Sequence, residues 1–373
     1  MRRFVCVFLL CGVICVGSSC HNRQNTLPLG VNLELTGRLA WYGQATLRGI
    51  TLAVEEINRD GGVNGKRIEL RVLDNRSENA EAALAAIKLS ARNQVLAIIG
   101  PSTSGGVKAS LSAECAAPIL VPSATADVLV PKSAKQNNMF RICYTDTMQG
   151  GAMAEFAAHR GFTSAALMIE ASSDYARGMS EAFETRFTQL GGTIAAREYY
   201  TGGETDYGSI LAKLKGRRFD VLFLPAYYTE AALVLRQLGE QGMSVPILSG
   251  DAFDSPALDT LVGNPAYLSD IYYSNHYDPG SEGQGAFAAA YHAAFGESPP
   301  AYAALGYDCA RLFADAAARC KSVSPAEIAA QLARTVEFNG ITGSITIDEN
   351  HNAQKQIHII ALQNGVRSTA GEE

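Results

Sequence analysis

Residues 94–129 constrain the fold more than any other part of the chain. Residues 95–99 form a short apolar, partly β-branched run that ends at Gly100-Pro101, as is typical of a buried parallel strand. A loop of small hydroxyl residues and glycines follows and leads into apolar residues at helical spacing. A second apolar run, residues 118–121, ends in similar residues. These elements predict an open α/β sheet whose strand ends face a ligand.

Hydroxyl side chains follow both predicted strands. Ser104 stands where the first loop enters a helix, and Ser123 and Thr125 follow the second strand. Free backbone N–H groups at a helix start attract anions, so these residues predict a cradle for a carboxylate. The alternative is that Ser104 and Thr125 only cap helices. The loop is not a nucleotide P-loop, because no Lys-Ser/Thr pair follows its glycines.

Strand-like and helix-like segments alternate along most of the 373 residues. Alternating runs at 27–35 and 68–72 are each followed by apolar residues at helical spacing, and in the second of these helices, 78–92, we expect Leu84 and Ile87 to face inward. A similar series begins after residue 143. The pattern predicts βαβ units, parallel sheets and two lobes that meet near Thr145.

The N-terminus has the features of an export signal. Arg2 and Arg3 precede an apolar run, residues 4–16, that is too short to span a bilayer, and small residues precede Cys20. Cys20 resembles the lipidated cysteine of a bacterial lipoprotein, although Gly17 stands where leucine is usual. Ordinary secretory cleavage nearby is the alternative. Both predict a periplasmic or cell-surface protein, and lipidation of Cys20 would be its only attachment to the membrane.

The charge balance argues against a nucleic-acid partner. Removing Arg2 and Arg3 with the leader leaves 29 basic against 37 acidic residues, whereas phosphate neutralisation requires a basic face. Four of the eight cysteines lie in the leader region. We expect the others to be free thiols, although export would permit a Cys115–Cys143 disulfide.

No pattern in the chain points to catalysis. The sequence lacks the G-x-S-x-G, H-E-x-x-H and dinucleotide-binding motifs. The six histidines are scattered, with no i, i+4 pair that would hold a metal. We therefore predict neither an enzyme nor a bound cofactor or metal.

Short motifs spread over nearly all of the mature chain carry a family resemblance. They are Leu35-Thr36-Gly37, Tyr42-Gly43, Gly61-Gly62-Val63-Asn64-Gly65, Ile99-Gly100-Pro101, Ser123-Ala124-Thr125, Arg141 with Asp146 and Gln149-Gly150, Asp174-Tyr175, and Phe338-Asn339-Gly340. In this order and spacing the chain resembles type I periplasmic solute-binding proteins of the branched-chain amino acid (Leu/Ile/Val) ABC transport group.

The resemblance implies two doubly wound, Rossmann-like α/β lobes joined by three hinge crossings, here placed near Thr145, His276 and Ser344. A ligand would bind in the cleft between the lobes, which would then close. The implied division is a signal peptide at 1–19, a linker at 20–27, lobe 1 at 28–144 with 276–343, lobe 2 at 145–275 with 344–365, and a tail at 366–373.

The resemblance also implies the ligand contacts. Ser104 and Thr125 would hold a carboxylate, the carbonyl of Ser123 would accept from an ammonium, and Asp251 would be the acidic partner of that ammonium. Tyr42, Tyr175 and Tyr227 would line the cleft.

Simpler roles remain open for these residues. The tyrosines could only pack between the lobes, and Asp251 could cap a helix. We expect Arg141 and Asp146 to form a structural pair near the first crossing. Glu34 stands where proline is common in the family, and Asp251 is one methylene shorter than the usual glutamate, so the identity of the ligand stays open.

Two functions follow from these observations. The first is a receptor that captures an amino acid, or a related amide or carboxylate, and delivers it to the permease of an ABC importer. The second is a non-transport lipoprotein that uses the same fold as a sensor or a partner-binding module, such as a regulator of a cell-wall synthase. Because the hydroxyls and the acidic group are both present, the first is favoured.

Overall fold

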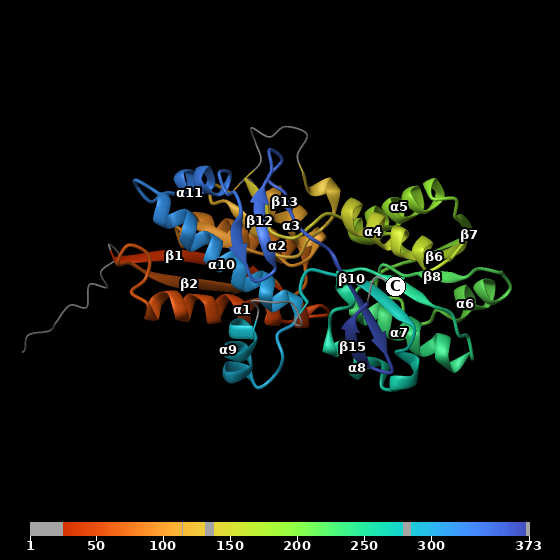
Figure 1. Ribbon diagram of the computed structural model, residues 1–373. Helices are drawn as coiled ribbons and strands as arrows, with labels where there is room; N and C mark the ends of the chain where they lie inside the picture. Colours follow the sequence, from red (N-terminus) through yellow and green to blue (C-terminus); the bar gives the residue numbers. More distant parts are fainter. Residues whose placement is uncertain (1–24, 114, 131–137, 279–284, 371–373) are drawn as a thin grey trace, which may run out of the picture.

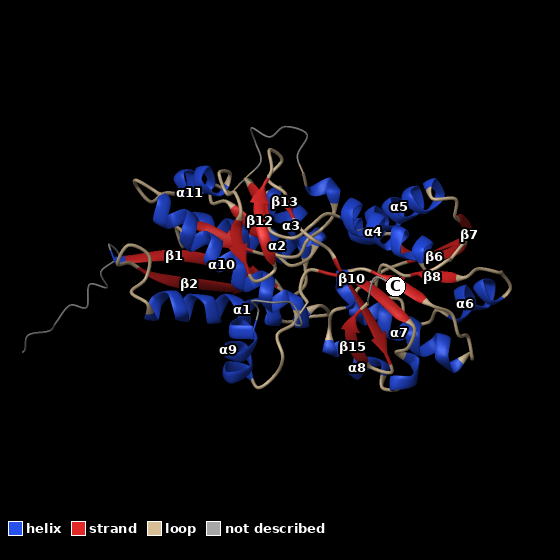
Figure 2. Cartoon of the chain, in the orientation of Figure 1, coloured by secondary structure: helices blue, strands red, loops and turns tan. Residues whose placement is uncertain are grey.

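The computed structural model describes residues 25–113, 115–130, 138–278 and 285–370. Two α/β units lie side by side in it (Figure 1). Each unit has a sheet with helices packed against it (Figure 2). The predicted signal peptide and Cys20 lie outside the described residues. Within those residues, no helix is both long and apolar enough to cross a membrane.

The first unit is built on a five-stranded parallel sheet in the order β2-β1-β3-β4-β5. The strands β3 and β4 are wholly apolar and buried, and their side chains divide between two core clusters on the two faces of the sheet. The strands are β1 (Thr26–Leu33), β2 (Arg67–Asp74), β3 (Ala97–Ile99), β4 (Ile119–Val121) and β5 (Met139–Arg141).

Helices from two distant parts of the chain complete this unit. In Figure 1 the red N-terminal elements and the blue C-terminal helices share one body. The helices are α1 (Ala40–Arg59), α2 (Asn79–Ile87) with a π-helical turn (Lys88–Arg92), α3 (Ser104–Leu111), α9 (Gly285–Phe295), α10 (Ala301–Arg319) and α11 (Pro325–Leu332).

The second unit has a seven-stranded sheet in the order β15-β14-β10-β9-β8-β6-β7. The strands from β6 to β10 are parallel, and the C-terminal strands β14 and β15 join antiparallel at one edge. The strands are β6 (Ser164–Glu170), β7 (Thr193–Tyr200), β8 (Val221–Phe223), β9 (Ile247–Ser249), β10 (Ile271–Asn275), β14 (His358–Gln363) and β15 (Val366–Thr369).

The helices of the second unit pack on its sheet around a core that also includes Leu39, Tyr42, Ala45 and Tyr302 of the first unit. A short 3-10 helix (Asp251–Phe253) follows β9 and places Asp251 at the end of that strand. The α-helices are α4 (Asp146–His159), α5 (Asp174–Gln189), α6 (Gly208–Lys215), α7 (Tyr228–Glu240) and α8 (Pro256–Val262).

The third crossing lies later than the sequence predicts. A small antiparallel sheet of β11 (Phe338–Gly340), β12 (Gly343–Ile347) and β13 (Ala353–Gln354) belongs to the first unit. The boundary predicted at Ser344 is therefore corrected to the segment after β13, because Ile345 and Ile347 of β12 point into the core beneath α10. The predicted tail from residue 366 also begins as strand β15, which pairs with β14.

Helix α2 presents a different face to the core from the one predicted. Leu84 and Ile87 are 58% and 45% exposed, whereas Ala82 and Ala86 are buried. Small side chains face inward because α2 packs closely against α3, where the Ala82 carbonyl accepts hydrogen bonds from Asn32 and Ser110. The expectation for Leu84 and Ile87 was wrong.

Helices α1 and α10 cross at glycines. A Cβ atom added to Gly49 would lie 1.9 Å from the Ala303 carbonyl oxygen, and one on Gly306 would lie 2.3 Å from that of Thr46. The two backbones are therefore nearly in contact, which only glycine permits. This crossing ties residues that lie about 250 positions apart into one core.

The four described cysteines are free thiols. Cys143 and Cys309 are buried, and Cys115 is half-buried, so the disulfide left open above does not form between Cys115 and Cys143. Burial raises the pKa of the Cys143 thiol to about 12, so it remains protonated at neutral pH.

Candidate functional site

Glu34 holds the loop that follows β3. Its buried carboxylate accepts hydrogen bonds from the Ser102 N–H at 3.1 Å, the Thr103 N–H at 3.3 Å and the Thr103 hydroxyl at 2.8 Å. Burial raises the pKa of Glu34. Glu34, which stands where proline is common in the family, thus supports the loop that carries Ser104.

Replacing Glu34 with alanine should destabilise the protein by at least about 2 kcal/mol, because each buried donor left without an acceptor costs roughly 1–3 kcal/mol. Urea unfolding of the purified protein measures the loss. The matched variant Glu34→Gln keeps one acceptor oxygen and should lose less.

Wild type and Glu34→Gln should also differ in how their stability depends on pH. Because the folded-state pKa of Glu34 lies above the ordinary value of 4.5, the native state binds a proton more readily than the unfolded chain does. Lowering the pH toward 4.5 should therefore stabilise wild type relative to Glu34→Gln, and an identical pH dependence of the two proteins would contradict this role.

The hydroxyls predicted to read a carboxylate lie on two loops that are bonded to each other. Ser123 donates to the Ser102 carbonyl at 3.0 Å, and Ser104 Oγ accepts from the Ala126 N–H at 3.3 Å. Thr125 Oγ1 accepts from Gln149 Nε2 at 3.2 Å. In the described part of the chain neither Ser104 nor Thr125 caps a helix with its side chain. The capping alternative therefore does not explain them.

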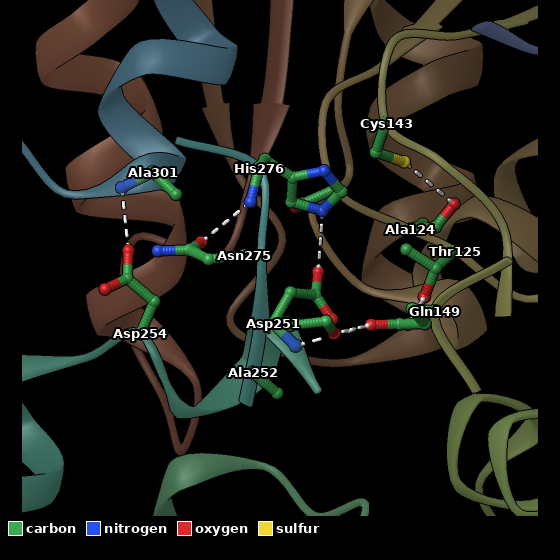
Figure 3. Close-up of polar contacts among 12 residues, drawn as sticks. Ala124, Thr125, Cys143, Gln149, Asp251, Ala252, Asp254, Asn275, His276 and Ala301 are labelled. Carbon is green, nitrogen blue, oxygen red and sulfur yellow. Dashed lines mark hydrogen bonds and ion pairs between the residues drawn. The ribbon is translucent and has the colours of Figure 1, made fainter. Parts of the chain in front are cut away.

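Asp251 stands opposite these loops, on the second unit. Its buried carboxylate lies 3.1 Å from Nε2 of His276, and its backbone N–H faces Gln149 Oε1 at 3.4 Å (Figure 3). Gly250, rather than Asp251, occupies the cap position of the 3-10 helix. The capping alternative for Asp251 is thus not supported either.

Gln149 connects the two halves of this site. Its side-chain N–H groups donate to Thr125 Oγ1 and, at 3.0 Å, to Asp146 Oδ1. Its oxygen accepts from the Ser274 hydroxyl at 2.8 Å and from the Asp251 N–H. One buried amide therefore bridges the first unit's Thr125 loop and the strand ends of the second unit (Figure 3).

The pair expected between Arg141 and Asp146 is not formed. Arg141 instead donates to the carbonyls of Thr125 at 2.6 Å and Ala126 at 2.8 Å. Arg141 aligns with Val121 in the sheet, which places its guanidinium beside the loop that follows β4. Asp146 is held by Gln149, and burial raises the pKa of its carboxyl.

The three predicted tyrosines come together between the units. The rings of Tyr175 and Tyr227 stack with centroids 5.4 Å apart, and Tyr42 lies 6.0 Å from Tyr227. The Tyr42 hydroxyl donates to the Ala252 carbonyl at 2.7 Å and accepts from the Tyr228 N–H at 3.0 Å. Burial raises the pKa of Tyr42, so its phenol remains a neutral donor.

Sequence reasoning missed four members of the site. Tyr302 stacks on Tyr42 at 4.5 Å, the Tyr228 N–H donates to Tyr42, Gln149 bridges the loops, and His276 bonds Asp251. Tyr302 follows Pro299-Pro300 at a helix start, which is a usable signal for a cleft residue. The bonds that join Gln149 to Thr125, Ser274 and Asp251, and His276 to Asp251, span more than 20 positions and leave no pattern in the sequence.

A polar cavity of about 780 Å³ opens beside Tyr227, with walls from both units. Ion pairs cross between the units here, from Arg38 to Glu230 and from Lys108 to Asp174. Such pairs are worth roughly 0–1 kcal/mol where they are exposed, as Lys108 is. Among the described residues, no group of three or more His, Cys, Asp or Glu is arranged to hold a metal.

Comparison with known proteins identifies the family. The family model described as periplasmic binding protein matches residues 26–367. This chain belongs to the periplasmic binding protein family. The predicted family and fold class are confirmed, and membership implies a location outside the cytoplasm.

Three relatives show which kinds of periplasmic binding protein this chain is similar to. Leu/Ile/Val-binding protein homolog 1 of Brucella abortus is 27% identical over 325 residues, 86% of each chain. The branched-chain amino acid transporter substrate-binding protein LivJ of Streptococcus pneumoniae, solved with isoleucine, is 34% identical with a TM-score of 0.87 over 92% of this chain and 99% of its own. The leucine-binding protein LivK of Thermotoga maritima is 32% identical with a TM-score of 0.86, over 93% and 98% of the two chains. These relatives are binding proteins rather than enzymes.

Proposed function

We propose that this periplasmic binding protein captures an L-α-amino acid with an aliphatic side chain and delivers it to an ABC importer. The observation that carries the proposal is a buried amide that joins a hydroxyl of the first unit to the acidic residue of the second. Ser104 and Thr125 stand on one unit and Asp251 on the other, and Gln149 bonds both Thr125 and the Asp251 backbone. The isoleucine complex of the S. pneumoniae relative supports this ligand class.

Each charge of such a ligand would have a partner between the two units. The carboxylate would lie against the Ser104 and Thr125 hydroxyls and the backbone N–H groups at the start of α3. The ammonium would lie between Asp251 and the Ser123 carbonyl. Tyr42, Tyr175 and Tyr227 would provide an apolar wall for the side chain. Because the two charges are held by different units, binding would favour closure.

A thermal-shift series on the mature protein tests the proposal, followed by titration calorimetry of positives. Isoleucine and leucine should raise the melting temperature, since a ligand that binds only the folded state stabilises it by mass action. Benzoate carries a carboxylate without an ammonium and should not. A shift with benzoate alone would mean that the site reads a simple acid. No shift with any ligand would favour the partner-binding lipoprotein.

Lipidation of Cys20 is a separate expectation, carried by the charged start, the short apolar run and the small residues before Cys20. Wild type should fractionate with membranes and incorporate labelled fatty acid, whereas Cys20→Ala should do neither. Unlabelled wild-type protein released freely from cells would instead indicate ordinary secretory cleavage.

A further inference from the structure

His276 lies where the three connections between the units come together. It follows β10 directly, on the second crossing, and its buried ring stacks on Tyr144 of the first crossing with centroids 3.7 Å apart. Lys355 and His358, from the third crossing and the strand that follows it, are close enough to act on its charge. One imidazole therefore belongs to the second connection, stacks on the first and lies within electrostatic range of the third.

The same imidazole is bonded to Asp251. Nε2 of His276 lies 3.1 Å from Asp251 Oδ2, and Figure 3 shows the ring directed at that carboxylate. In the tautomer that carries its proton on Nε2, His276 donates to Asp251 Oδ2 and Nδ1 is the bare nitrogen. Nδ1 is buried and has no hydrogen-bond partner among the described residues. The backbone N–H of His276 is bonded separately, to Asn275 Oδ1 at 2.9 Å.

We propose that His276 is a positioning residue for Asp251: in its neutral form it orients that carboxylate toward the ammonium of the ligand, and in its protonated form it competes with that ammonium. This inference rests on the proposed function, because it assumes that Asp251 reads an ammonium. It adds a residue that touches no ligand, and it makes the affinity of the cleft depend on pH.

The surroundings of His276 determine the direction of the effect. Burial lowers the pKa of the imidazole, and Lys355, with His358 once that residue is protonated, acts in the same direction, whereas Asp251 raises it. His276 is therefore neutral at pH 7. Acidification places a second proton on Nδ1, and the resulting imidazolium pairs with Asp251 and repels a cationic ligand group. The affinity for the ligand should therefore fall as the pH is lowered, by up to about tenfold for each pH unit below the pKa of His276.

Titration calorimetry with isoleucine between pH 7.5 and 5 tests the inference in three proteins. His276→Phe keeps a ring to stack on Tyr144 but has no donor, and should bind ~10- to 100-fold more weakly at pH 7.5, because a hydrogen bond to a charged group is lost. His276→Gln keeps an N–H donor without a titrating group, so it should bind more tightly than His276→Phe and lose the pH dependence. The control His292→Gln alters an exposed histidine on α9 and should match wild type throughout.

A measurement without ligand separates this inference from the proposed function. The pKa of His276, followed by NMR, should fall in Asp251→Asn, since the charge that stabilises its protonated form is removed. If isoleucine does not bind but this shift occurs, the proposed function fails and the pairing stands. If the pKa is unchanged in Asp251→Asn, or if His276→Gln keeps the pH dependence of wild type, the inference is overturned.

Discussion

Asp251→Ala should abolish measurable binding of isoleucine while the protein remains folded. The carboxylate is buried at the end of β9, opposite the loops that carry Ser104 and Thr125. Removing one member of a buried, hydrogen-bonded charge pair costs roughly 2–5 kcal/mol, a loss of about 30-fold or more in affinity. Calorimetry on the purified variant measures this loss, and circular dichroism verifies the fold.

Three further variants test whether the loss of binding is due to the charge of Asp251. Asp251→Asn keeps the shape of the side chain and an acceptor for His276 but not the charge, so it should also bind weakly. Ser104→Ala should lose less, because the backbone N–H groups of the loop remain. Asp315→Ala, on the outer face of α10, removes only a pair with Arg319 and should bind as wild type does. Full affinity in Asp251→Ala would show that the ligand is not read as a zwitterion.

Gly49→Ala should produce the largest loss of stability from a single methyl group. The added Cβ would stand 1.9 Å from the Ala303 carbonyl oxygen, so α1 and α10 would have to separate along their contact. Overpacking of this kind costs typically 1–3 kcal/mol and occasionally more, and contact with backbone rather than with a flexible side chain places this site at the upper end, about 3 kcal/mol. Urea unfolding gives the value.

Gly151→Ala is the matched control, since it makes the same change within a helix. A Cβ at Gly151 of α4 would meet nothing within 4 Å. Alanine should there stabilise the protein by about 0.5–1 kcal/mol, because it loses less backbone entropy on folding. Equal effects of the two substitutions would mean that the α1–α10 contact is not tight.

The sequence predicts the fold well where burial alone determines which residues a strand contains. Short apolar runs that end in glycine or proline and small polar residues mark β3 and β4, because strands buried on both faces are built mostly from apolar side chains. Tyr42 of the first unit reaches the segment of the second unit that follows β9, where its hydroxyl donates to the Ala252 carbonyl beside Asp251. The ligand contacts of Tyr42, Ser104 and Asp251 stay predictions.

The failures have identifiable physical causes. Periodicity at Leu84 and Ile87 predicts the wrong face of α2, since close packing there selects alanine. The third crossing was misplaced because the alternation of Ile345 and Ile347 fits a strand in either unit equally well. The bonds of His276 and Gln149 join residues brought together only by the folded chain, so no local pattern reports them.

The crossing of α1 with α10 also bears on how the protein acquires its structure. The ribosome makes α10 about 250 residues after α1, and strands β14 and β15 of the other unit come later still. The first core is complete only after β13 and the second only after β14, so a chain that emerges from its N-terminus has no finished unit until most of it has been made. A truncation after residue 300 would remove core elements from both units. In a protein whose domains follow one another along the chain, the same truncation would leave the first domain intact.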